Sequence, residues 1–257
     1  MSLDLSPRPG AASHASMLRT QTAMELRLQL RNGEQLLLTM VIPLLLLVMG
    51  THSDRVVDLG DGRPIDIITP GVLALAVLST SFTSLAIFTG FERRYGVLKR
   101  LGASPLPRSV LLLGKLGAVL VIELIQLVLL SIVALALGWD PDGSPMSWLW
   151  LVLLALLGTG AFGALGMLIA GTLRAEATLA VANLVYVVLL VGGAVLVPLD
   201  RYPDGAQSFL KLLPSGALGQ ALRDVFDGAG PGLGPVVVLL MWGLVAGVLT
   251  ARTFRWE

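Results

Sequence analysis

The chain contains no cysteine and only two histidines. Without cysteine, disulfide bridges and thiolate metal sites are both excluded. The histidines, His14 and His52, lie outside the apolar runs, which disfavours a serine–histidine pair inside a membrane. The pattern G-x-x-x-x-G-K-S/T, whose amides and lysine hold nucleotide phosphates, is also absent, so the chain is not expected to bind ATP.

Charged residues are scarce as well: they make up 14% of the 257 residues, whereas hydrophobic residues make up 55%. A water-soluble fold could not cover that much apolar surface. The charges form short blocks between long apolar runs, as expected for bilayer spans and their connecting loops. Residues 1–35 are polar and show no apolar core of a signal peptide, so we expect the mature chain to begin at Met1.

Six apolar runs predict an all-α membrane protein with six transmembrane helices. Most of them are long enough to cross about 30 Å of hydrocarbon at 1.5 Å per residue. The first must include flanking turns or thin the bilayer locally. The runs are Leu36–Gly50, Ile67–Phe91, Ser109–Leu137, Trp148–Gly171, Thr178–Leu199 and Pro235–Ala251.

Basic residues define the expected orientation. With the N-terminus inside, 13 of the 18 basic residues fall on the inner side, which satisfies the positive-inside rule. We therefore expect a multi-pass protein of the bacterial inner membrane with both termini in the cytoplasm. Arg8 and Arg255 belong to the inner group. The five basic residues expected outside are Arg55, Arg63, Arg201, Lys211 and Arg223.

The segment before the first run, Ser16–Glu34, is rich in good helix formers and predicts a helix. However, Met24, Leu26, Leu28 and Leu30 alternate with polar residues, which is the period of a strand. The two signals conflict, and helix is the interpretation we prefer.

The outer segment 200–234 contains a second helical pattern. Its apolar residues recur at one-turn spacing, with Ser215 as the expected N-cap and Gly228 as the expected stop. Such a helix is too short to cross the membrane, and it is expected to lie in the outer leaflet. The apolar residues are Ala217, Leu218, Ala221, Leu222, Val225 and Phe226.

The inner block Phe91–Lys115 carries the most specific motif. Charged residues from Glu92 to Arg100 precede Pro105 and Pro107, and Ser109 then opens the next apolar run. This pattern predicts a short cytoplasmic helix tied at both ends to transmembrane helices. The alternative is an ordinary loop of the positive-inside type.

The order of residues in this block resembles the signature of type-2 ABC exporter permeases, the class that includes the daunorubicin-exporter-like membrane subunits. Thr69–Gly71 and the outer stretch Leu212–Phe226 resemble the same class. The residue Val97 departs from it, since many relatives carry threonine there. The matching residues are Glu92, Arg93, Gly96, Leu98, Arg100, Leu101, Pro105, Leu106, Arg108, Gly114 and Lys115.

The resemblance implies a dimer of six-helix subunits, made with a second copy or a paralogue, and bound by two ATPase subunits that hold ATP and Mg. It implies an elbow helix within 1–35, a transmembrane domain over 36–251 with a coupling loop at 91–108 and an outer helical loop at 200–234, and a tail at 252–257. The residues it implies for coupling are Glu92, Arg93, Arg94, Tyr95, Gly96, Lys99 and Arg100.

Polar residues inside the spans are candidates for a substrate path, because a polar group facing lipid is costly. They are equally explained as hydrogen-bonded structural groups. Gly160 with Ala164, and Gly166 with Ala170, have the spacing of close helix packing rather than of a dinucleotide site. The path candidates are Ser81, Ser84, Glu123, Gln126, Asn183 and Tyr186.

We therefore predict the permease subunit of an ATP-driven exporter of an amphipathic or hydrophobic small molecule, drug or lipid. The chain itself is expected to be no enzyme, to bind no cofactor or metal and to contact membrane lipids but no nucleic acid. The alternatives are an ion-coupled secondary transporter that uses Glu123, and an intramembrane enzyme. Each alternative predicts activity without an ATPase.

Overall fold

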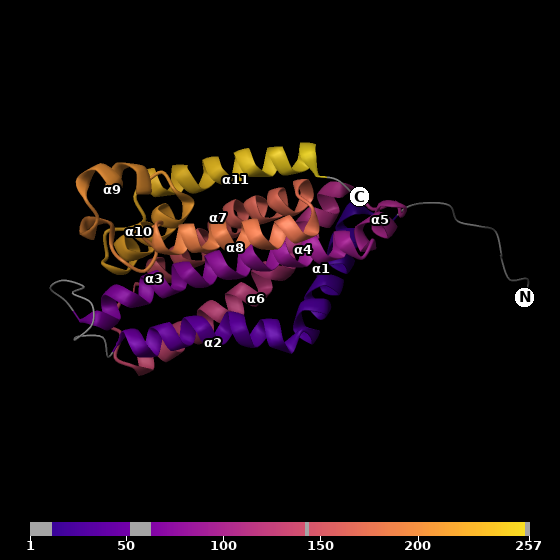
Figure 1. Cartoon of the computed structure of the whole chain (residues 1–257). Coiled ribbons are helices and arrows are strands. Elements are labelled where there is room, and N and C mark those ends of the chain that lie inside the picture. Colours follow the sequence, from indigo (N-terminus) through magenta and orange to yellow (C-terminus); the bar gives the residue numbers. More distant parts are fainter. Residues whose placement is uncertain (1–11, 52–62, 142–143, 255–257) are drawn as a thin grey trace, which may run out of the picture.

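A computed structural model describes residues 12–51, 63–141 and 144–254 (Figure 1). Every regular element in these ranges is helical, which confirms the predicted all-α class. The charged residues Arg8, Arg55 and Arg255 lie outside the described residues. The elements are α1 (His14–Arg31), α2 (Gly33–Gly50), α3 (Pro64–Leu78), η1 (Ser79–Thr83), α4 (Ser84–Arg94), α5 (Val97–Gly102), α6 (Arg108–Ala136), α7 (Pro145–Thr172), α8 (Ala175–Val191), η2 (Leu199–Arg201), α9 (Asp204–Leu210), α10 (Pro214–Phe226) and α11 (Leu233–Thr253).

Four of the described helices are long and apolar enough to cross a membrane. One of them is the continuous helix Pro64–Arg94, made of α3, η1 and α4, and the others are α6, α7 and α11. The apolar helices α2 and α8 are shorter, with Thr39–Gly50 and Ala175–Val191 as their apolar parts. Each predicted apolar run therefore falls on a helix, while six crossings stay a prediction.

The long helices run side by side between two ends of the molecule (Figure 1). The C-terminal turn of α4, together with α5, lies at one end, and α9 and α10 lie at the other. The middle of the bundle is α3, in which every residue from Ile68 to Leu78 is buried. A helix that is apolar on all sides is typical of a buried position, and α3 packs against α2, α6, α7 and α10.

The short helix predicted in the inner block is present as α5, but the prediction that it begins at Glu92 is wrong. The helix α4 continues through Arg94, and α5 begins at Val97 after a break at Tyr95 and Gly96. Gly96 has φ of 68°, in the left-handed region that glycine adopts at least cost. The chain changes direction at this break, so Glu92 lies on α4 and Arg100 lies on α5.

The fifth apolar run also departs from its prediction, because α8 ends at Val191 and not at Leu199. The chain then turns, and Ala194 has φ of 52°. The outer helix α10 begins at Pro214, with Leu213 in place of Ser215 as its N-cap. Gly228, with φ of 82°, does follow the end of that helix as predicted.

The helix α1 resolves the conflict between the two periodicities. It buries Gln21, Glu25 and Gln29 on one stripe, while Met24 and Leu28 are exposed. The helix therefore turns a polar stripe toward the protein and leaves apolar side chains exposed, the reverse of a helix on a soluble protein.

Candidate functional site

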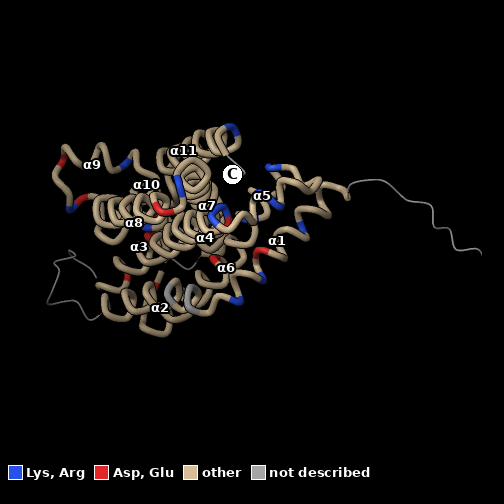
Figure 2. The backbone as a smooth tube through the Cα atoms, turned by 45° about the vertical axis from the view of Figure 1, so that its right-hand side comes forward, with Lys and Arg blue, Asp and Glu red and all other residues tan. Residues whose placement is uncertain are grey.

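Lysine and arginine residues lie on α1, on the C-terminal turn of α4 and on α5, at one end of the molecule (Figure 2). Four of the predicted coupling residues lie on the outside of this region: Arg94, Tyr95, Lys99 and Arg100 are exposed. Tyr95 is 65% exposed, and its ring stacks on that of Phe91 at a centroid distance of 6.2 Å. These four side chains, called here the outward set, are accessible to a soluble partner.

Glu92 points inward instead. Its Oε2 lies 2.5 Å from Nζ of Lys115 on α6, and the same Nζ lies 2.9 Å from Oε1 of Glu25 on α1. Lys115 is buried, and Gln21 donates a hydrogen bond of 2.7 Å to Glu25. One buried ammonium group is therefore shared by two carboxylates from two helices.

Arg93 also contacts the interior of the bundle. Its Nη1 donates to the backbone carbonyls of Ala170, at 3.3 Å, and Leu173, at 2.9 Å. These carbonyls lie in the last turn of α7 and just after it, where carbonyls lack helical partners and favour cations. Arg93 thereby ties the end of α4 to the end of α7.

Two glycines on α6 allow α1 to approach closely enough for the lysine contact. A Cβ placed on Gly114 would lie 3.0 Å from Cβ of Gln21, and one on Gly117 would lie 3.1 Å from Oγ1 of Thr22. The small residue before Lys115 thus permits the helix crossing, and the lysine then reaches Glu25. The glycine–lysine pair of the sequence motif has a direct structural reason.

Glu25 and Lys115 were not among the predicted site residues. The available signal was a lysine inside the helix Arg108–Ala136, because a charge in a membrane helix requires a partner. In the sequence, Lys115 belongs to the matching motif and to the inner-side charges, but nothing there identifies its partner. Its partner Glu25 lies 90 positions earlier in the chain, so the sequence alone could not identify the pair.

Gln126 lies inside the bundle, where it joins three helical elements. Its Oε1 accepts a hydrogen bond of 2.6 Å from Thr80, and its Nε2 donates one of 2.7 Å to the carbonyl of Thr39. Thr80 belongs to η1, a π-helical turn that displaces the hydroxyl from the regular helical position. Ser81 instead donates to the carbonyl of Val77, four residues earlier.

Glu123 lies one turn from Gln126 and is completely buried. The hydroxyl Oγ1 of Thr159 on α7 lies 2.7 Å from its Oε1. The other oxygen, Oε2, has no hydrogen-bond partner among the described residues. Glu123 therefore connects α6 to α7.

The six path candidates do not share one surface. Ser81, Ser84, Glu123 and Gln126 are buried inside this chain. In contrast, Asn183 is exposed on α8 and Tyr186 is half-buried there. A route that touches all six would need the helices to separate.

At the opposite end, Arg223 on α10 is a buried cation that sequence reasoning missed. Its Nη1 donates to the carbonyl of Ala194, at 3.3 Å, and its Nη2 to that of Val195, at 2.6 Å. Burial lowers the pKa of Arg223 to about 10, which keeps the guanidinium charged near neutral pH. A Cβ on Gly71 would lie 3.2 Å from Nη2, so this glycine leaves room for the contact.

An all-helical bundle with several membrane-length helices, internal polar contacts and a basic end defines a multi-pass membrane protein. The sequence profile of the ABC-2 type transporter family matches residues 17–226, and the chain belongs to this family. It is also 24% identical over 228 residues to a protein of Bacillus subtilis strain 168 named "Putative transport permease YvfS". That match covers 88% of this chain and 92% of the relative.

Proposed function

We propose that this chain is the permease subunit of an ATP-driven exporter, with ATP and Mg held by a separate ATPase subunit. The observation that carries the proposal is the division of the coupling residues into two sets. Arg94, Tyr95, Lys99 and Arg100 are exposed at the basic end, whereas Glu92 and Arg93 fasten the same segment to the bundle. A force applied to the outward set would thus reach the membrane helices.

The proposed mechanism follows the contacts of this segment. Closure of the ATPase pushes on α5 and the end of α4, and the Glu92–Lys115 contact passes the displacement to α6. Lys115 passes it further to α1 through Glu25, and Arg93 passes it to α7. Because α4, η1 and α3 form one continuous helix, a tilt at Arg94 also moves the centre of the bundle.

Six crossings, both termini in the cytoplasm and a dimer with a second copy or a paralogue belong to the same proposal. Exposed apolar side chains on α8, including Leu184, Val187 and Val188, support a contact with lipid or with a second permease. The cargo we propose is an amphipathic or hydrophobic small molecule, drug or lipid. The path between subunits would include Asn183 on the exposed side of α8.

Gentle affinity purification from native membranes tests the proposal. The expected result is co-purification of an ATPase subunit that carries the G-x-x-x-x-G-K-S/T motif, together with ATP hydrolysis that the permease alone lacks. Transport by liposomes that contain this chain alone, driven by an ion gradient, would contradict the proposal. That outcome would favour the secondary-transporter alternative.

A further inference from the structure

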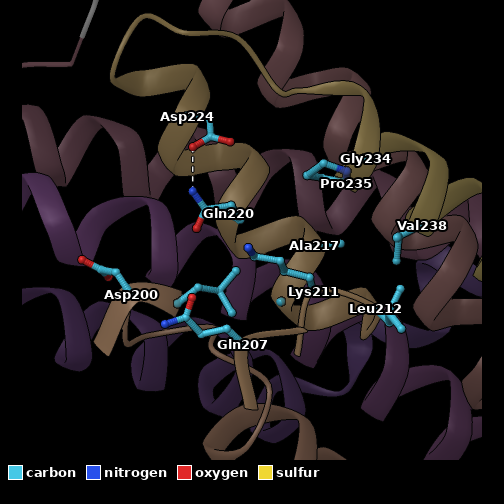
Figure 3. Close-up of a pocket in the computed structure, with 12 residues that line it drawn as sticks. Asp200, Gln207, Lys211, Leu212, Ala217, Gln220, Asp224, Gly234, Pro235 and Val238 are labelled. Carbon is cyan, nitrogen blue, oxygen red and sulfur yellow. Dashed lines mark hydrogen bonds between the residues drawn. The ribbon is translucent and has the colours of Figure 1, made fainter. Parts of the chain in front are cut away.

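A pocket of about 520 Å³ lies between η2, α9, α10 and the first turns of α11, at the end opposite the outward set (Figures 1 and 3). This volume is typical of small-molecule sites, which fall between about 300 and 1,000 Å³. We call it the α10 pocket. None of its lining residues belongs to the coupling contacts or to the path candidates described above.

The α10 pocket is polar on one side and apolar on the other. Figure 3 shows Asp200, Lys211 and Asp224 toward one side, and Leu212 and Val238 toward the other. A pocket with two such walls matches an amphipathic ligand better than an ion or a sugar. The buried floor contains Gly216 and Ala217, so the ligand can approach the backbone of α10.

Two of the charged groups in the pocket, Asp200 and Asp224, interact electrostatically with the buried guanidinium of Arg223. Among the residues that the structure describes, neither Asp200 nor Lys211 forms an ion pair. Oδ1 of Asp224 accepts a hydrogen bond of 2.6 Å from Gln220, which orients this carboxylate without neutralising it. Two carboxylates and one ammonium group therefore line the pocket without a direct ion pair to another described residue, so each can contact a ligand that carries both charges.

A divalent metal ion does not fit these residues. Within the described ranges, no three histidine or acidic side chains come together in a way that could hold a metal. A primary ammonium group fits better, because its three protons can bind the carboxylates and the amide oxygens at the same time.

A tryptophan contacts the backbone of the pocket at Leu212. Trp242 on α11 donates from its indole nitrogen to the carbonyl of Leu212 at 2.8 Å, and tryptophan is enriched at membrane–water boundaries. Leu212 at the rim is 61% exposed. Met241 and Val245 lie on the same face of α11 as Val238 and are exposed, which gives an apolar surface where acyl chains can pack.

We propose that the α10 pocket binds a phospholipid whose headgroup carries a primary ammonium beside a phosphate, as phosphatidylethanolamine does. The ammonium binds Asp200 and Asp224, the phosphate binds Lys211, and an acyl chain follows Leu212 and Val238 onto α11. This inference concerns lipid recognition at one end of the bundle and does not depend on coupling to an ATPase.

Native mass spectrometry of the purified full-length protein tests this inference. The protein is titrated with phosphatidylethanolamine, with phosphatidylglycerol, which lacks the ammonium, and with phosphatidylcholine, whose quaternary ammonium cannot donate hydrogen bonds. We expect phosphatidylethanolamine to bind about tenfold more tightly than either, since each charged hydrogen bond contributes about that factor. Equal affinity for the three lipids would overturn the inference.

Four variants refine the test. Asp200→Asn and Lys211→Gln remove exposed charges that line the pocket, and each should reduce the phosphatidylethanolamine preference several-fold. Arg201→Gln and Asp140→Asn remove exposed charges that do not line the pocket, and these controls should leave the preference unchanged. A preference that survives both pocket variants, or is lost equally in the controls, would also overturn the inference.

Discussion

Lys115 and Glu92 form a contact between two helices inside the protein, with Nζ of the lysine 2.5 Å from Oε2 of the carboxylate. Glu25 lies 2.9 Å from the same nitrogen, so the single positive charge of Lys115 is shared between two carboxylates and cannot fully neutralise both. A charge buried in low-dielectric surroundings interacts strongly with its partners, and removing those partners costs the protein stability. The stability of this region should therefore depend on Lys115.

We predict that Lys115→Met destabilises the protein by about 3–5 kcal/mol, because two buried carboxylates lose their counter-charge. Thermal unfolding of the detergent-purified protein measures the effect. The triple variant Glu25→Gln, Glu92→Gln and Lys115→Met removes all three charges and should recover most of the loss. If Lys115→Met unfolds at the wild-type temperature, the buried contact contributes nothing to stability.

Charge reversal of the outward set should act on partner binding and leave folding intact. We predict that Lys99→Glu combined with Arg100→Glu reduces co-purification of the ATPase subunit at least about tenfold, as expected when like charges face each other at an interface. The unfolding temperature should stay unchanged, because both side chains are exposed. The matched control is Arg201→Glu, an exposed arginine at the opposite end.

If the Arg201→Glu control loses the ATPase equally, the loss is caused by the change in overall charge and not by the outward set. Unchanged co-purification of the double variant would place the partner surface elsewhere on the molecule. Glu92→Gln should lower ATPase stimulation by the permease without lowering co-purification, since Glu92 contacts Lys115 and not the exterior.

Two glycines on α7 offer a matched pair for a packing test. A Cβ on Gly166 would lie 2.6 Å from the carbonyl oxygen of Phe82, whereas nothing lies within 4 Å of one on Gly160. Gly160 instead borders a groove of about 440 Å³ between α6, α7 and α11. We predict that Gly166→Ala destabilises the protein by about 1–3 kcal/mol, since backbone atoms must shift.

Gly160→Ala should be neutral or slightly stabilising, because alanine favours the helix by about 1 kcal/mol over glycine. Thermal unfolding of both variants under the same conditions checks the pair. Equal destabilisation would contradict the packing of α7 against η1. The close-packing prediction from sequence holds at Gly166, and at Gly160 the close approach is made by Gly243 of α11, where an added Cβ would lie 3.7 Å from the carbonyl carbon of Gly160.

Arg223 should hold the turn that follows α8. We predict that Arg223→Met destabilises the protein by about 2 kcal/mol or more, because the carbonyls of Ala194 and Val195 lose their donors. Arg223→Lys should recover only part, since an ammonium group lacks the planar fork that reaches both carbonyls. Proteolysis within 192–198 checks the prediction, and equal resistance in all three proteins would contradict it.

The apolar runs predicted the bounds of a helix well where no contact from a distant part of the sequence determines its end. The run Ser109–Leu137 became α6 at Arg108–Ala136, within one residue at each end. The run Thr178–Leu199 failed at its end, because the turn after Val191 is stabilised by Arg223, which lies 28 positions beyond Val195. Hydropathy contains no information on such a distant donor.

The candidate site shows the same limit. The sequence motif identified Glu92 and the neighbouring basic residues, but it could not tell that Glu92 faces Lys115 while Arg100 faces outward. That distinction arises at Gly96, where the left-handed backbone turns the chain between α4 and α5. If one helix continued through Gly96, the charged residues before and after it would lie on other faces than those observed.

Glu123 distinguishes the proposed exporter from an ion-coupled transporter. Its Oε1 lies 2.7 Å from Oγ1 of Thr159, and glutamine in its place keeps an oxygen acceptor for that hydroxyl while removing the titratable group. In an ATP-driven permease we predict that Glu123→Gln leaves export within about twofold of wild type. The hydrogen bond is conserved, and its net contribution is only about 1 kcal/mol.

Glu123→Leu is the informative companion, because it removes the acceptor and leaves the Thr159 hydroxyl with the carbonyl of Ala155 alone. It should lower the unfolding temperature slightly without abolishing export. An ion-coupled transporter predicts a different outcome. Both variants would fold, but both would lose ion-driven transport completely, because neither side chain can bind or release a proton. Transport assays in liposomes, with ATP and with an imposed proton gradient, separate the two outcomes.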